Sequence, residues 1–173
     1  MNSTQAMVTG ERADLLASLA RQRHFLRHTV GDLTDEQASQ RTTVSELCLG
    51  GLIKHVAAVE QRWLRFITDG PAAMAGGGSS ADPDAWANLF RMLDGETLSG
   101  LLAEYGRVAR QTDELVAALP DLDADQPLNS PWFPPGTRWT ARRVLLHVIA
   151  ETAQHAGHAD IIRESLDGQK TMG

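Results

Sequence analysis

Apolar residues recur with the 3.6-residue period of an α-helix along nearly the whole chain, and no segment shows a convincing alternation of apolar and polar residues. This pattern predicts an all-α fold. A length of 173 residues suits one domain, so we expect residues 1–173 to form a single domain with its core at about 10–168. The long helices are expected at about 10–30, 45–70, 97–119 and 140–168.

The lengths of the connections predict how these helices are arranged. A short connection with one small turn separates the first two, so they should pack antiparallel. The next connection holds a glycine- and serine-rich run at 73–82 and a short expected helix from Pro83 to about Met92. It is long enough to cross the bundle, which makes the helices on either side of it parallel. We therefore expect a four-helix bundle of up-down-down-up topology with a long crossover between the second and third helices.

Composition favours a globular protein that acts on small molecules. Apolar residues make up 42% of the chain and charged residues 22%, and the net charge of −6 gives no reason to bind nucleic acid or an anionic membrane. The N-terminal residues lack the pattern of a signal peptide, and no apolar run approaches the length of a membrane span. Cys48 has no second cysteine with which to form a disulfide. We expect a cytoplasmic protein with a small-molecule substrate and neither nucleic-acid nor membrane partners.

One face of the helix expected at 140–168 carries His147, Glu151, His155 and His158. At about 100° per residue, side chains three or four positions apart share one stripe of a helix. Imidazole and carboxylate groups at such spacings are good ligands for a transition metal. The stripe therefore predicts a metal site on this helix.

His55 is the candidate ligand from a second helix, because it lies on the apolar side of the segment 45–70 that should face inward. Metal sites in bundles combine a ligand on one helix with an i, i+4 pair on a facing helix. His55, Glu151 and His155 would supply two imidazoles and one carboxylate. Three protein ligands leave positions open for water or substrate, which is typical of a catalytic ion.

Several of these side chains also have a purely structural interpretation. His147 is interpreted as a packed or capping histidine, with a role behind the ligands as the alternative. His158 is either a fourth ligand or a hydrogen-bonding neighbour. His24 and His28 have i, i+4 spacing but arginine-rich surroundings, which favours surface histidines. Cys48 is interpreted as a small buried side chain.

Three local expectations concern the helices at 10–30 and 45–70. The arginines of the first, Arg23 among them, should lie in water. Ser45 should cap the start of the second. The adjacent Gly50 and Gly51 would allow a neighbouring segment to approach closely.

The proline-rich loop at 127–139 is expected to form one wall of the substrate pocket. Trp132 and Phe133 would be its apolar contacts and the residues that bind a cosubstrate. The prolines restrict the backbone, so an ordered loop costs little entropy. The alternative is that the two aromatic side chains only close the end of the core.

The segments GLIKHVAAVEQRWL and HVIAETAQHAGHADIIRESLDG resemble the DinB-like superfamily of metal-binding four-helix bundles, which includes mycothiol-dependent maleylpyruvate isomerase and bacillithiol transferases. The resemblance covers about residues 11–168. It implies a divalent ion, zinc or nickel, held by His55 together with Glu151 and His155. Many members have glutamine where this chain has His158, which would make that histidine a fourth ligand or a proton-transfer group.

The resemblance also implies a reaction class. A low-molecular-weight thiol of the mycothiol type would be activated at the ion for transfer or isomerisation, because a bound cation stabilises the thiolate. A metal-dependent hydrolase is the enzymatic alternative, and a non-catalytic metal-binding stress-response protein is the other. We also include a second copy of the chain, in a homodimer, among the candidate partners.

Overall fold

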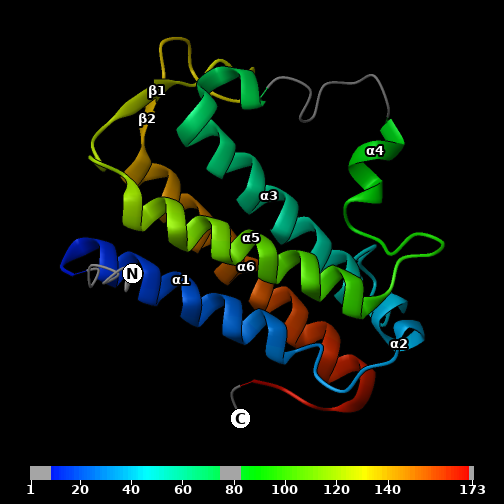
Figure 1. Ribbon diagram of the computed structural model, residues 1–173. Coiled ribbons are helices and arrows are strands. Elements are labelled where there is room, and N and C mark those ends of the chain that lie inside the picture. The colour runs from blue at the N-terminus through cyan, green and yellow to red at the C-terminus, as the bar shows by residue number, and fades with distance from the viewer. Residues whose placement is uncertain (1–8, 75–82, 172–173) are drawn as a thin grey trace.

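The computed structural model describes residues 9–74 and 83–171. Its long helices form a bundle in which α1 and α6 run in one direction and α3 and α5 in the other (Figure 1). The predicted four-helix bundle of up-down-down-up topology is therefore confirmed. The long helices are α1 (Glu11–His28), α3 (Leu49–Asp69), α5 (Leu98–Ala118) and α6 (Ala141–Asp167). The shorter elements are α2 (Asp35–Ser39), the 3₁₀ helix η1 (Gly70–Met74), α4 (Pro83–Asn88), β1 (Asp125–Pro127) and β2 (Arg138–Thr140).

The helix ends follow local capping chemistry. The Thr140 hydroxyl accepts a hydrogen bond from the Arg143 amide at the start of α6, and Gly168 ends the helix in the left-handed conformation with φ 82°. The expected cap of α3 was wrong, because this helix begins at Leu49 and not near Ser45. The Cys48 sulfur accepts the amide of Gly51 and so takes the capping position.

The connection between α5 and α6 folds into a small antiparallel ribbon that the sequence did not predict. Gln126 pairs with Trp139 at its centre. Each strand has only three residues, which is too short for an apolar alternation to be recognised. The ribbon matters for the site because it holds Trp139, which is buried, directly before α6.

The core lies along the length of α6, which packs against both α1 and α3. Leu26, Ile53 and Ile162 belong to the apolar cluster near the C-terminal end of α6. Phe66 and Val148 belong to the cluster near its other end. Among the described residues, no helix is long and apolar enough to cross a membrane.

Arg23 is buried in this core, with 6% of its surface exposed, which corrects the expectation that it lies in water. Its guanidinium forms an ion pair with Glu60 of α3 and lies 2.8 Å from Asp113 Oδ1 of α5. Glu60 also accepts a hydrogen bond of 2.5 Å from the Thr112 hydroxyl. A charge is buried at tolerable cost when it is paired in this way. Its partner lies on another helix, so the sequence pattern of α1 did not reveal it.

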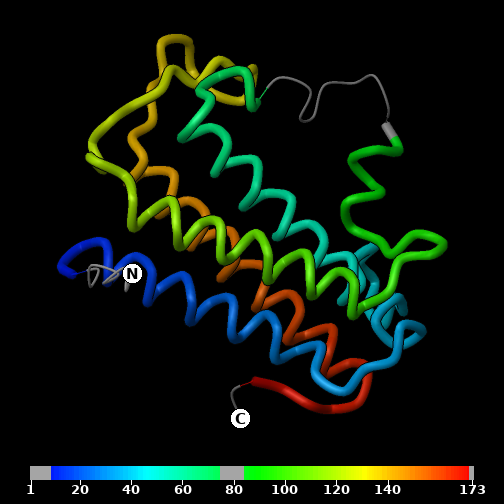
Figure 2. Tube along the Cα trace, viewed as in Figure 1, coloured from blue at the N-terminus to red at the C-terminus, as the bar shows by residue number. Residues whose placement is uncertain are grey.

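The close approach predicted at the two glycines is confirmed. A Cβ atom at Gly51 would overlap the backbone of Phe90 and Arg91, and one at Gly50 would overlap the Met92 side chain. The expected short helix from Pro83 to about Met92 is present as α4, which ends earlier, at Asn88. Figure 2 shows the chain after α4 lying beside the first half of α3 before it enters α5. Most of the glycine- and serine-rich run at 73–82 lies outside the described residues.

Candidate metal centre

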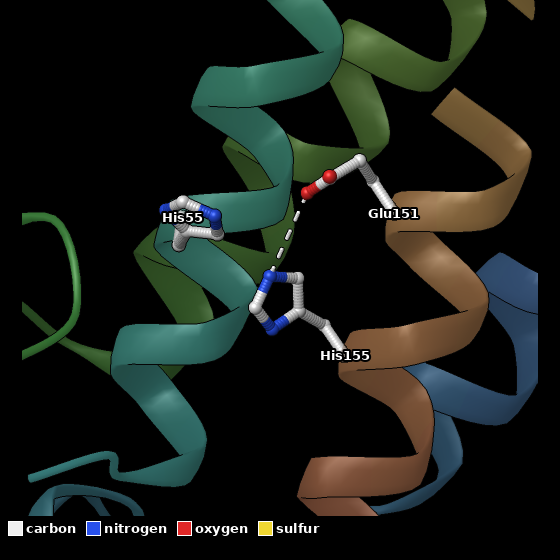
Figure 3. A group of neighbouring side chains, drawn as sticks. All are labelled: His55, Glu151 and His155. Carbon is white, nitrogen blue, oxygen red and sulfur yellow. Dashed lines mark ion pairs between the residues drawn. The ribbon is translucent and has the colours of Figure 1, made fainter. Parts of the chain in front are cut away.

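Three donor side chains converge between α3 and α6. His55 comes from α3, and Glu151 and His155 come from adjacent turns of α6 (Figure 3). One ligand atom from each of the three lies within 4.8 Å of the others. The i, i+4 spacing on α6 and the inward position on α3 therefore bring together the three residues that the sequence analysis singled out.

The distances suit a single small cation. His155 Nε2 lies 3.7 Å from Glu151 Oε2, as the dashed line in Figure 3 marks. Ligand atoms bonded to one zinc ion at about 2.0–2.2 Å lie roughly 3–4 Å from one another. The three donors thus need to close by little more than about 1 Å to share an ion.

His55 is the most deeply buried of the three donors. The residue is only 4% exposed, and its Nδ1 atom is buried without a hydrogen-bond partner in the described structure. A buried polar atom left unsatisfied costs about 1–3 kcal/mol. His55 also stacks on the Phe90 ring at a centroid distance of 4.0 Å, which fixes the plane of the imidazole. A divalent ion with two imidazole ligands and one carboxylate fits these observations.

Burial keeps the two imidazoles uncharged. It lowers the pKa of His55 to about 4, with a smaller contribution from the neighbouring His155. It likewise lowers the pKa of His155 to about 4, with His158 as the second cause. Burial raises the pKa of Glu151. At neutral pH both imidazoles therefore keep a nitrogen lone pair that can bind a cation.

His158 lies on the far side of the His155 ring. Its Nδ1 atom is 3.4 Å from His155 Nδ1, whereas His155 Nε2 faces Glu151. The group of three converging donors does not include His158. Its role as a fourth ligand remains a prediction, and its position is that of a residue that holds the His155 ring in place.

His147 lies one turn before Glu151 on α6. Its Nε2 atom is 3.9 Å from Glu151 Oε1, so the two carboxylate oxygens face different histidines. The ring packs against Trp63 and Trp139, with centroid distances of 4.8 and 5.2 Å. Burial lowers the pKa of His147, and Arg143 contributes. The interpretation of His147 as a packed histidine is thus correct, and the same side chain also faces the site.

A cavity of about 380 Å³ opens beside the three donors, and its walls come from α3, α6 and the segment around α4. Sequence reasoning missed most of these walls. Arg62 and Trp63 lie seven and eight residues after His55. Helical spacing is therefore the sequence signal that could have identified them, because it puts them on the same face of α3 as His55. The lining residues are His55, Ala58, Val59, Arg62, Trp63, Trp86, Leu89, Phe90, His147, Glu151, Gln154 and His155.

The predicted contacts Trp132 and Phe133 do not line this cavity. Trp132 is 75% exposed. Phe133 packs edge-on against Trp139 at 5.2 Å, and Trp139 in turn contacts His147. The loop therefore touches the site through Trp139, and its role in binding a cosubstrate remains a prediction.

The remaining candidates lie away from the three donors. His24 and His28 are exposed on α1, as expected of surface histidines. Cys48 is buried and caps α3.

Comparison with known proteins is consistent with this geometry. The family model of the mycothiol-S-transferases matches residues 14–168. The chain is also similar to a crystal structure of a conserved protein from Enterococcus faecalis, with a TM-score of 0.69, 14% sequence identity, and coverage of 94% of this chain and 100% of that one. At this identity the likeness concerns the fold alone. No curated protein matches the sequence.

Proposed function

Because the chain belongs to the mycothiol-S-transferase family, a metal-dependent group within the DinB-like superfamily, we propose that His55, Glu151 and His155 hold the metal ion of this enzyme. The expected membership in the DinB-like superfamily is confirmed by this match together with the shared fold. The observation that carries the proposal is the convergence of the three donors, with the buried His55 on α3 facing Glu151 and His155 on α6.

The donor set favours zinc, with nickel as the second candidate. Two imidazoles and one glutamate are a ligand set found in catalytic zinc sites, and imidazole also suits nickel. A divalent ion bound there would supply a thiolate at neutral pH, because the cation lowers the pKa of a coordinated thiol.

Within this proposal, His147 accepts the proton of the thiol, and two aromatic side chains shield the donors from water. The Nε2 atom of His147 lies 3.9 Å from Glu151 Oε1, and the residue lines the cavity. Burial keeps this imidazole uncharged at pH 7, so it is able to accept the thiol proton and pass it to solvent. The rings of Trp63 and Phe90 exclude water from the donors and leave an apolar path for the electrophile.

The cosubstrate would extend from the cavity along a row of aromatic side chains. Trp139 stacks on Trp63 at 4.7 Å, and Phe133 lies beyond it. A thiol with its sulfur at the donors and its body along this row would reach Phe133, and the exposed Trp132 is its neighbour in the sequence. This arrangement supports the proposal that both residues contact mycothiol.

The test combines metal content with activity. Purified protein is expected to contain about one equivalent of zinc or nickel and to conjugate mycothiol to 1-chloro-2,4-dinitrobenzene. His55→Ala should lose both the metal and the reaction, whereas His24→Ala, on the surface of α1, should lose neither. Full metal content in His55→Ala would overturn the ligand assignment, and hydrolysis without thiol would favour the hydrolase alternative.

Two further expectations belong to this proposal. A family that uses a small reduced thiol supports action in the cytoplasm. A homodimer remains a prediction, which light scattering on the purified protein tests.

A further inference from the structure

We propose that Arg62 selects the electrophile by binding a carboxylate on it, so that the preferred substrate is a flat, apolar electrophile bearing one carboxylate. The inference rests on the proposed function and names the class of its second substrate. It follows from the position of Arg62, from its lack of a partner, and from the charges and surfaces around it.

Arg62 shares a face of α3 with His55. The two residues are seven positions apart, which corresponds to about two turns and roughly 10 Å along the helix axis. Arg62 lines the same cavity as the metal donors. Helical side chains lean toward the N-terminal end of their helix, so the long Arg62 side chain covers part of this distance and a substrate with one aromatic ring would span the rest.

Arg62 is half-buried, yet it forms no hydrogen bond or ion pair in the part of the chain that the structure describes. The two fully buried arginines are both paired. Arg23 binds Glu60 and Asp113, and Arg163 binds Asp167 and two backbone carbonyl groups. Arg62 thus presents an unmatched positive charge to the cavity, and guanidinium groups bind carboxylates in a bidentate manner.

The charges at the donors leave no anion for Arg62. Glu151 and an ionised thiol carry two negative charges, which a divalent ion balances. Among the described residues that line the cavity, Glu151 is the one carboxylate, and it belongs to the metal donors. We therefore assign the negative charge that matches Arg62 to the electrophile.

The other walls describe the body of this substrate. Trp63, Trp86 and Phe90 present aromatic surface to the cavity. Flat apolar groups pack well against such surfaces, with ring centroids about 4.5–7 Å apart. An aromatic or conjugated electrophile with one carboxylate fills both requirements.

The test uses two electrophiles of nearly the same shape and different charge, 4-chloro-3-nitrobenzoate and 4-chloro-3-nitrobenzamide, and each enzymatic rate is divided by the rate of the uncatalysed reaction. In each reaction the thiol sulfur bonds to the ring carbon that carries chlorine, chloride leaves with the bonding electron pair, and the thiol proton passes to solvent. The metal-loaded wild-type enzyme should prefer the benzoate in kcat/KM by about 10-fold or more, as expected for a charge-assisted contact. Arg62→Gln should abolish this preference by lowering kcat/KM for the benzoate and not for the benzamide. The KM for mycothiol should stay unchanged.

Binding provides a readout that does not depend on turnover. Quenching of tryptophan fluorescence in the metal-loaded protein by 4-nitrobenzoate and by 4-nitrobenzamide gives their dissociation constants. Arg62→Gln should weaken nitrobenzoate by about 10-fold and leave nitrobenzamide unchanged, and Arg62→Lys should retain part of the difference. The matched control is Arg65→Gln, since Arg65 is exposed and lies outside this cavity.

The possible outcomes distinguish the role of Arg62 from the proposed mycothiol transfer. Equal use and equal binding of acid and amide by the wild-type enzyme would overturn the role of Arg62, whether or not the variants fold, and would leave mycothiol transfer standing. Arg62-dependent binding of nitrobenzoate without any transfer would overturn the proposed reaction and leave the inference standing. A selective loss of the acid in Arg62→Gln, with intact metal content, supports both.

Discussion

The Nδ1 atoms of His158 and His155 lie 3.4 Å apart, on the side of the His155 ring that faces away from Glu151. A partner at this nitrogen orients the ring and leaves Nε2 for the ion. We therefore expect His158→Gln to weaken zinc binding by about 10–100-fold, and His155→Gln to weaken it far more. Competition with a chelating dye measures both affinities. Equal losses would show that His158 is a fourth ligand.

The stability of the metal-free protein should depend on pH through the buried imidazoles. Burial lowers the pKa of His55 and of His155 from 6.5 to about 4. Between pH 6.5 and 4 the unfolded chain takes up protons that the folded side chains do not. The free energy of unfolding should therefore fall as the pH is lowered through this window and be independent of these groups above it.

The measurement is the Tm of chelator-treated protein between pH 4 and 7.5. The raised pKa of Glu151 makes stability change with pH in the opposite direction. The contribution of His155 is therefore the difference in the pH dependence of Tm between wild type and His155→Gln. His155→Gln should lose less stability on acidification, and His24→Gln should follow the wild type. A parallel pH dependence in His155→Gln and wild type would contradict the prediction.

Removal of the buried arginine should destabilise the bundle without involving the metal. Arg23→Ala leaves Glu60 buried and unpaired, which is expected to cost about 3–5 kcal/mol of the free energy of unfolding. Arg107→Ala breaks an exposed pair with Glu104 and should cost at most about 1 kcal/mol. Urea denaturation of the two variants tests the contrast, and similar losses would mean that the buried pair contributes no more than a surface one.

Gly51→Ala should displace the segment that follows α4. The added Cβ atom would overlap the Phe90 carbonyl group, and backbone cannot move aside as a flexible side chain can. We expect a loss of about 1–3 kcal/mol and a higher KM for the electrophile at unchanged metal content. Gly157→Ala is the matched control on α6, where an added Cβ meets nothing within 4 Å and should stabilise the helix by up to about 1 kcal/mol. Equal tolerance of both substitutions would show that the contact at Gly51 is not restrictive.

The parts of the molecule that depend on local pattern were predictable from the sequence. Helical periodicity gave the four long helices, and i, i+4 spacing gave Glu151 and His155. The resemblance to a known superfamily pointed to the same donors and to mycothiol chemistry. These features depend on residues within two or three turns of one another, which is why they are visible in one sequence.

The features that were missed depend on contacts between distant segments. The burial of Arg23 depends on Glu60, which lies on another helix, so the pattern of α1 alone indicates an exposed side chain. The cap of α3 is Cys48, whereas capping preferences favour the nearby Ser45. Trp86 became part of the site only through the packing of the crossover against α3, and no local pattern encodes that packing.

The contact between Gly51 and Phe90 means that one wall of the cavity is not part of the four-helix bundle. The metal donors belong to α3 and α6, whereas Trp86 and Phe90 belong to the connection between α3 and α5. Substitutions in this connection can reshape the space for the electrophile while the donors keep their positions. A lineage with this fold can thus acquire new substrates by changing one surface segment and inherit the reaction itself unaltered.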